Sequence, residues 1–323
     1  MKILTYLLRR FLVSATLVWG VLSLTFLLIH LTGDPTAIYL NPQMDEKTLA
    51  AIRRQMGFDL SLWQQYFVWL RGFITGHFGF SFVQMRPVSD IFAEALLNTF
   101  QLTVVVFGVQ LFGGVLLGVC TGIKRRSKLD VMVNSFLLFI YSMPGFWLAL
   151  IAIMIFSLKL RWLPSSQMQS IVGVEGFWPQ LADRIKHLIL PVLVLAMPFL
   201  AYTTRFVRAG ISEVLAQDYI RTALAFGIRR RKIWFKYALK NALLPLVTIG
   251  GLYLPFLLGG AVITEYIFAW PGMGSLAINA IYAHDFPVVL ASTFIAALSV
   301  IAGNFLADLL YFLADPRIKK PAV

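Results

Sequence analysis

The sequence predicts an all-α membrane protein with six transmembrane helices. Hydrophobic residues make up 59% of the 323 residues and charged residues only 13%, against about 45–50% and about 25% in soluble domains. A transmembrane helix needs about 20 apolar residues. Six apolar runs approach or exceed this length, and no charged residue lies inside any of them: 11–31, 100–123, 131–156, 188–204, 242–264 and 288–307.

The first run follows a basic N-terminus that contains Lys2, Arg9 and Arg10. Secretory signal peptides have a shorter apolar core, of about 7–15 residues, and a small-residue cleavage site. This run is longer and continues into His-Leu-Thr-Gly-Asp-Pro. Residues 1–31 are therefore expected to form an N-terminal segment and a retained first transmembrane helix.

Residues 32–99 form the longest loop between two apolar runs. Asp45 begins and Gly57 ends a pattern typical of a short helix. Residues 62–74 are aromatic and amphipathic, and they are expected either to lie in the membrane interface or to pack against the transmembrane helices.

A transmembrane core is expected over residues 100–307, followed by a tail at 308–323. The fourth run is the shortest and contains Pro191 and Pro198, which a membrane helix tolerates when neighbouring helices satisfy the freed backbone groups. A basic loop at 205–241 separates the fourth and fifth runs.

The distribution of Lys and Arg predicts the orientation. Residues 1–10, 124–130, 205–241 and the tail carry 19 of the 28 basic residues, and the loops on the other side carry nine. The positive-inside rule places the more basic side in the cytoplasm, so both termini are expected there. We attribute the net charge of +13 to this topology, and not to nucleic-acid binding.

The loop 205–241 contains a predicted short helix from Asp218 to Phe226. A stripe of mostly small residues lies along it, which would let another surface approach the backbone closely: Ala216, Ile220, Ala223 and Gly227. Beyond it, Lys232, Lys236 and Lys240 recur every fourth residue and predict an interfacial helix facing lipid headgroups. The alternative is a solvated basic connector.

The sequence does not favour an enzyme. It contains neither the Gly-x-x-x-x-Gly-Lys-Ser/Thr phosphate loop nor a His-Glu-x-x-His zinc motif. Its four histidines are far apart and its single cysteine, Cys120, lies within an apolar run. We expect no catalytic residue, metal or cofactor in this chain.

Two acidic residues, Glu265 and Asp285, frame the last loop on the less basic side. They are expected to stabilise the local structure, and the alternative is attraction of a cation or of a ligand's amino group. Between them, Trp270, Pro271, Gly272 and Gly274 predict a rigid turn with an aromatic anchor.

Several motifs, in order along the chain, resemble the permease subunits of ABC importers, in the branch that imports dipeptides, oligopeptides and nickel. The basic loop has the pattern Tyr-x-Arg-x-Ala-x-Ala-x-Gly, formed by Tyr219, Arg221, Ala223, Ala225 and Gly227. Further resembling segments are GHFGFS (76–81), SMPGFWLAL (142–150), EYIFAWPGMG (265–274) and LADPRIK (313–319). In GHFGFS, His77 stands where the family motif has aspartate. The general permease signature is Glu-Ala-Ala, three residues, then Gly, and only Ala223 and Gly227 match it.

The resemblance implies a type I importer fold, with a flanking first helix and a five-helix core, in the bacterial inner membrane. It also implies four kinds of partner: a second homologous permease, two cytoplasmic ATPases that use ATP and Mg, an extracytoplasmic substrate-binding protein, and membrane lipid. The expected ATPase-coupling residues are Asp218, Tyr219, Arg221, Ala223, Ala225 and Gly227. The expected outer gate region contains Glu265, Trp270, Pro271, Gly272 and Gly274.

Import of peptides by alternating access is the expected function. Import of nickel or another small solute by the same mechanism is the alternative. A secondary transporter is less favoured, because ion relays need ionisable residues within the membrane and the six runs contain none. A membrane scaffold that transports nothing would not need the small-residue stripe.

Overall fold

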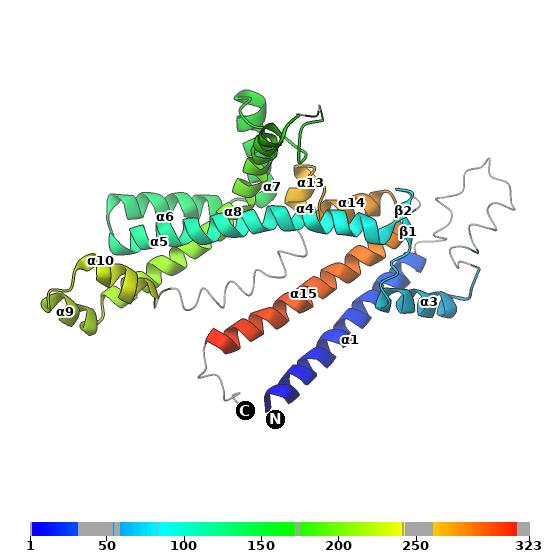
Figure 1. The fold of residues 1–323 in the computed structure, drawn as a ribbon, viewed down its shortest axis with the longest axis horizontal. Helices are drawn as coiled ribbons and strands as arrows, with labels where there is room; N and C mark the ends of the chain where they lie inside the picture. The colour runs from blue at the N-terminus through cyan, green and yellow to red at the C-terminus, as the bar shows by residue number, and fades with distance from the viewer. Residues whose placement is uncertain are drawn as a thin grey trace.

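A computed structural model describes residues 2–31, 54, 59–81, 83–171, 173, 175–240, 242 and 261–314. These residues are almost entirely helical (Figure 1). The helices α5, α6, α9 and α10 gather at one end of the molecule, on the left of Figure 1, whereas the strands and α3 lie at the other end.

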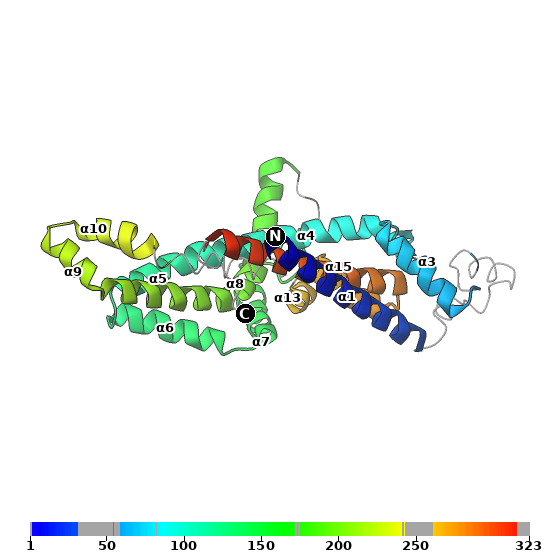
Figure 2. The ribbon, with the colours of Figure 1, turned by 90° about the horizontal axis from the view of Figure 1, so that it is seen from below.

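The first and last helices run side by side along one side of the molecule (Figures 1 and 2). They are α1 (Lys2–Leu31) and α15 (Phe286–Ala314). Large apolar side chains on α1, such as Phe11 and Leu17, are exposed. An exposed apolar surface of this extent is typical of contact with lipid or with another membrane protein.

Helix α3 (Leu62–Ile74) has the bounds of the predicted aromatic segment. Tyr66 and Trp69 contact Phe26 of α1, with ring centroids 5.3 and 5.4 Å apart. Phe73 contacts Phe294 of α15 at 5.1 Å. Of the two alternatives, the segment therefore packs against the long helices.

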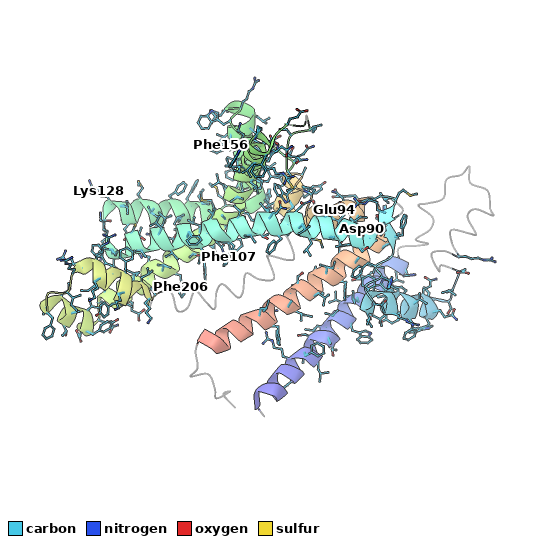
Figure 3. The ribbon with its side chains drawn as sticks, in the orientation of Figure 1. Asp90, Glu94, Phe107, Lys128, Phe156 and Phe206 are labelled. Atoms are coloured by element: carbon cyan, nitrogen blue, oxygen red, sulfur yellow. The ribbon has the colours of Figure 1, made fainter. Side chains whose placement is uncertain are left out.

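A short antiparallel hairpin, β1 (Phe80–Ser81) and β2 (Arg86–Pro87), leads into α4 (Val88–Gly108). Asp90 lies in the first turn of α4, where a negative charge complements the helix dipole. One turn later Glu94 accepts two hydrogen bonds from Arg86, at 2.6 and 3.0 Å, and Figure 3 shows Asp90 and Glu94 at this end of α4.

The second apolar run lies in a longer helical stretch, Val88–Ile123, which contains α4, the π-helix η1 (Val109–Gly113) and α5 (Gly114–Ile123). Glycines on α5 allow very close packing against α8 (Phe177–Leu215). A Cβ atom added to Gly118 would lie 2.6 Å from Cβ of Val207, and one added to Gly114 would lie 2.7 Å from Cβ of Thr203.

The third apolar run is bent into two helical segments. Helix α6 (Lys128–Tyr141) is followed by α7 (Gly145–Ala152) and the π-helix η2 (Ile153–Lys159), at an angle of 104° to α6. Pro144 immediately precedes α7. Because proline lacks an N–H and disfavours helical backbone in the residue before it, α6 ends here.

Helix α8 is 39 residues long and continues through Pro191 and Pro198. It extends beyond the predicted fourth run, 188–204, at both ends.

A buried carboxylate connects α8 to α6. Asp130 accepts hydrogen bonds from Nε and Nη2 of Arg208, at 2.5 and 2.8 Å, and from the backbone N–H of Arg126 at 2.8 Å.

The remaining elements follow α8 along the chain. They are α9 (Asp218–Ala225), α10 (Arg230–Lys232), the π-helix η3 (Ile233–Ala238), α13 (Val262–Ile267), α14 (Met273–Tyr282) and α15.

Within the described residues, four helices are long and apolar enough to cross a membrane, and the α6–α7 pair adds one bent candidate. Three parts of the chain lie mostly outside the described residues: the predicted fifth run, the predicted helix from Asp45 to Gly57 and the end of the tail. An all-α membrane fold is therefore confirmed, whereas the count of six and the division of the chain at residues 31, 99 and 307 stay predictions.

Candidate functional site

Helix α9 begins two residues after α8 ends, at the end of the molecule where α5 meets α6 (Figure 1). Its bounds agree with the helix predicted from Asp218 to Phe226. One face packs against its own chain: Ile220 and Ala223 form a buried cluster with Ile233 of η3, and Val214 and Leu215 of α8 cover that cluster.

Gly227 ends α9 in a Schellman motif. The N–H of Ile228 donates to the carbonyl of Ala223 at 3.1 Å, and the N–H of Gly227 donates to that of Leu224 at 3.0 Å. Gly227 has a φ of +74°, which glycine adopts without the steric cost that a Cβ atom brings. A Cβ at this position would meet no atom within 4 Å. Glycine is therefore favoured at position 227 by its positive φ, and not by the close approach of another part of the chain.

The predicted small-residue stripe does not form one external face. Ile220 and Ala223 are only 1% and 9% exposed and face inward, whereas Ala216 and Gly227 are exposed. Ala223 therefore lies beneath the surface of α9 in this chain, and its role in ATPase coupling stays a prediction. The reason is that the apolar stripe of α9 is covered by α8 and η3 of the same chain.

The outward face of α9 is formed by other residues. Asp218 and Arg221 form an exposed ion pair at 3.3 Å, which as a surface pair contributes roughly 0–1 kcal/mol. Tyr219, Leu224 and Phe226 expose 47, 44 and 83% of their surface. Phe226 is itself the C-cap residue, so α9 presents an aromatic ring on a helix end of fixed backbone geometry.

The basic segment after α9 also differs from a regular α-helix. Lys232, Lys236 and Lys240 are all exposed, as expected. The π-helix η3 lies between Lys232 and Lys240 and contains Lys236, however, and it buries Ile233 and Ala238. The cations thus face outward while one side of the segment packs against α5 and α8.

Glu265 is fully buried and joins three parts of the chain. Its Oε1 accepts from the hydroxyl of Thr99 on α4 at 2.9 Å and from the N–H of Ala261 at 3.3 Å. Its Oε2 accepts from the N–H groups of Gly274 and Ser275, in the first turn of α14, at 2.7 and 3.3 Å. A carboxylate there satisfies free N–H groups of the helix N-terminus, so the geometry agrees with the structural interpretation of Glu265.

The turn after Glu265 is fixed to α4 by Asn98. The indole N–H of Trp270 donates to the carbonyl of Asn98 at 2.9 Å, and the amide of Asn98 donates to the carbonyl of Pro271 at 2.9 Å. Trp270 is 1% exposed. The predicted aromatic anchor therefore packs inside the chain.

Close packing leaves no room for a side chain at Gly272 or Gly274. A Cβ on Gly272 would lie 2.6 Å from Oε2 of Glu265, and a Cβ on Gly274 would collide with the backbone of Val262. The five predicted gate residues, Glu265, Trp270, Pro271, Gly272 and Gly274, are thus brought together in one packed turn.

Asp285 precedes α15 and is 1% exposed. It accepts a hydrogen bond from the hydroxyl of Ser81 on β1, which ties the hairpin to the start of α15. Burial raises the pKa of the Asp285 carboxyl, and the hydrogen bond from Ser81 partly opposes this rise.

Sequence reasoning missed Thr99, Asn98, Asp130 and Arg208. The first two lie more than 160 positions from their partners in the turn. Asp130 and Arg208 lie just outside the third and fourth apolar runs. Two residues of opposite charge beside consecutive apolar runs were the available signal. No group of residues that could hold a metal ion is found in the described part of the chain.

Comparison with known proteins identifies related chains along the whole length. Residues 114–320 match the family described as binding-protein-dependent transport system inner membrane component, and residues 3–103 match the N-terminal domain of the same membrane components. The oligopeptide transport system permease protein AppB of Bacillus subtilis is 37% identical over 316 residues, which cover 97% of this chain and 99% of AppB.

A second relative is the glutathione transport system permease protein GsiC of Escherichia coli. It is 33% identical over 317 residues, which cover 98% of this chain and 99% of GsiC. Together with the apolar helices, these matches support a multi-pass protein of the inner membrane. The chain belongs to the binding-protein-dependent transport system inner membrane components, the permease subunits of ABC importers.

Proposed function

We propose that this chain is the permease subunit of an ATP-driven importer that moves peptides across the inner membrane by alternating access. The match along nearly the whole length to permeases named for oligopeptide and glutathione transport carries this proposal. The nickel alternative is not needed to account for these relatives.

The ATPase is proposed to be a separate subunit. The chain contains no phosphate loop, so ATP and Mg are expected to bind to two cytoplasmic partners. The purified chain alone should hydrolyse no ATP, and activity should appear when the ATPases and a second, homologous permease are added. ATP hydrolysis by the isolated chain at the rate of the assembled transporter would contradict the proposal.

The outward face of α9 is the proposed contact with an ATPase. Asp218, Tyr219, Arg221 and Ala225 remain candidates for this contact, because all four are exposed. Ala223 and Gly227 are assigned a different role: Ala223 packs in the cluster beneath α9, and Gly227 provides the backbone turn that ends the helix. Leu224 and Phe226 join the outward face.

On the opposite side, the turn built around Glu265 is proposed to be a rigid part of the outer gate, against which a substrate-binding protein delivers its cargo. This role requires the orientation predicted from the basic residues, with both termini in the cytoplasm. In a Cys120→Ala background, Ile171→Cys should react with an impermeant maleimide in intact cells and Arg230→Cys should not. The reverse pattern would overturn the orientation.

Substrate class is tested with the assembled transporter in proteoliposomes. Uptake of a labelled oligopeptide should depend on ATP and on the binding protein, and Ni²⁺ should be neither taken up nor able to compete. Saturable, ATP-dependent uptake of Ni²⁺ without uptake of peptide would favour the nickel alternative.

A further inference from the structure

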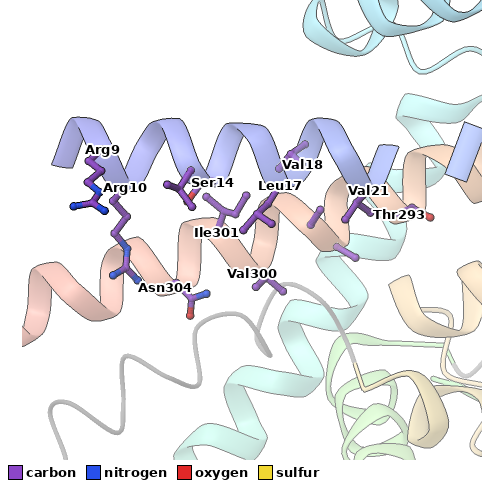
Figure 4. A pocket seen from close by; sticks show the side chains of 13 residues that line it. Arg9, Arg10, Ser14, Leu17, Val18, Val21, Thr293, Val300, Ile301 and Asn304 are labelled. Carbon is purple, nitrogen blue, oxygen red and sulfur yellow. The ribbon is translucent and has the colours of Figure 1, made fainter. Parts of the chain in front are cut away.

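A groove of about 810 Å³ runs between α1 and α15 (Figure 4). We propose that it binds one anionic phospholipid, with the phosphate beside Arg9 and an acyl chain along the groove. Neither the peptide-transport proposal nor the family assignment requires this site.

The charge of the groove is confined to one end. Arg9 and Arg10 lie there together with the amide of Asn304 from α15, as Figure 4 shows. A cation and an amide donor are the groups that bind a phosphodiester oxygen. Arg10 also takes part in another interaction within the chain, so the proposal depends on Arg9.

The rest of the groove is apolar. Leu17 and Val21 of α1 line it together with Ala297 and Val300 of α15, and Leu17 remains 61% exposed. The only other polar side chains among its lining residues are Ser14 and Thr293. The hydroxyl of Thr293 donates to the carbonyl of Val289 on its own helix. An acyl chain would therefore meet mainly methyl and methylene groups.

The length of the groove fits one leaflet. Arg9 and Val21 are separated along α1 by about 18 Å, at about 1.5 Å per residue. Half of a hydrocarbon core about 30 Å thick is about 15 Å. A helix of a second permease would cross both leaflets, whereas this groove ends at Val21, about two-thirds of the way along α1, so its dimensions favour a lipid. The predicted orientation places Arg9 in the cytoplasmic leaflet, where anionic lipids attract basic residues.

The test measures lipid retention by the full chain, purified with its co-purifying subunits. The detergent-solubilised protein is incubated with phosphatidylglycerol or phosphatidylcholine, and bound lipid is counted by native mass spectrometry. Wild type should retain phosphatidylglycerol preferentially. Glycerol 3-phosphate, which carries the phosphate without acyl chains, should not displace it at equal concentration.

Two variants probe the two ends of the groove. Arg9→Gln should lower retention of phosphatidylglycerol roughly fivefold, the change that corresponds to about 1 kcal/mol per charge near a membrane surface, and Arg9→Lys should restore it. Ala297→Phe keeps the charge but fills the groove, and it should lower retention as well. Arg184→Gln, which removes an exposed cation near the start of α8 and outside the basic segment, is the matched control and should behave as wild type.

Three results would refute the proposal. The first is equal retention by the Arg9→Gln and Arg184→Gln proteins, and the second is full retention by Ala297→Phe. The third is binding to the isolated chain that disappears in the assembled transporter, which would identify the groove as an interface between proteins. Elution of every variant as a single peak on size exclusion separates lost lipid binding from misfolding.

Discussion

The turn at 261–275 and the segment at 216–228 are similar in length but are stabilised in different ways. Glu265 receives four hydrogen bonds in the turn, and one of them comes from α4, 166 positions away. Segment 216–228 depends on one small apolar cluster and a glycine C-cap, and it exposes most of its other side chains. Substitutions in the turn should therefore act on folding, and those on α9 should act on binding.

The largest expected effect is that of Glu265→Ala. It leaves the buried hydroxyl of Thr99 and several backbone N–H groups without their acceptor, and each buried unsatisfied group costs about 1–3 kcal/mol. We expect a loss of at least about 3 kcal/mol and little folded protein in the membrane. Glu265→Gln keeps the shape and one acceptor oxygen, so it should be milder. Membrane abundance and thermal melting of the purified chain measure both, and a fully abundant Glu265→Ala protein would remove the distinction between the segments.

A pair of glycine substitutions sharpens the comparison. Gly274→Ala places a Cβ against the backbone of Val262, and overpacking of this kind costs about 1–3 kcal/mol or more. Gly227→Ala meets no neighbour, but it forces a φ of +74° on a residue with a side chain, at a cost of about 1–2 kcal/mol. We expect Gly274→Ala to lower abundance, and Gly227→Ala to keep abundance but lower ATPase co-purification. Equal loss of abundance in both would show that the C-cap is needed for folding too.

Phe226→Ala tests the outward face of α9 directly. The ring is 83% exposed, and exposed substitutions usually change stability by less than about 0.5 kcal/mol. Truncating an aromatic interface residue typically costs about 1–2 kcal/mol of binding, or roughly 5- to 30-fold. Pull-down of the ATPase should fall by this factor while abundance stays constant. If Phe226→Ala retains the ATPase as well as wild type does and takes up peptide normally, this face does not contact the ATPase.

The smallest effect is expected for Arg230→Ala. Arg230 lies on the exposed basic segment, where a headgroup contact contributes about 1 kcal/mol. ATPase pull-down and peptide uptake should both stay close to wild type. If this variant loses more uptake than Phe226→Ala, the basic segment, and not the outward face of α9, is the main coupling surface.

Local patterns in the sequence predicted local structure well. The aromatic stretch 62–74 and the helix after Asp218 have the expected bounds because amphipathic spacing and a terminal glycine are encoded within a few residues. The bend at Pro144 was not predicted, since hydropathy measures how apolar a run is and not its direction.

The candidate sites were harder to predict. Spacing showed that Ile220 and Ala223 share a face of α9, but the same spacing arises whether that face meets another protein or the chain itself. The composition of the turn pointed to Glu265 and Trp270, yet their partners Thr99 and Asn98 come from α4. Such pairings depend on how distant helices pack, which no local pattern contains.

The glycine contact between α5 and α8 has a mechanical consequence. Helix α8 is about 58 Å long, at about 1.5 Å per residue, and the contact holds it from Thr203 to Ile211, close to α9. The middle of α8 is also packed, with Val192 and Ala196 against α4 and Leu190 and Val194 against α7, so α8 is not free to pivot on the glycine contact. We therefore expect a displacement of α9 to move α5 and the adjoining end of α8 together, as one rigid unit.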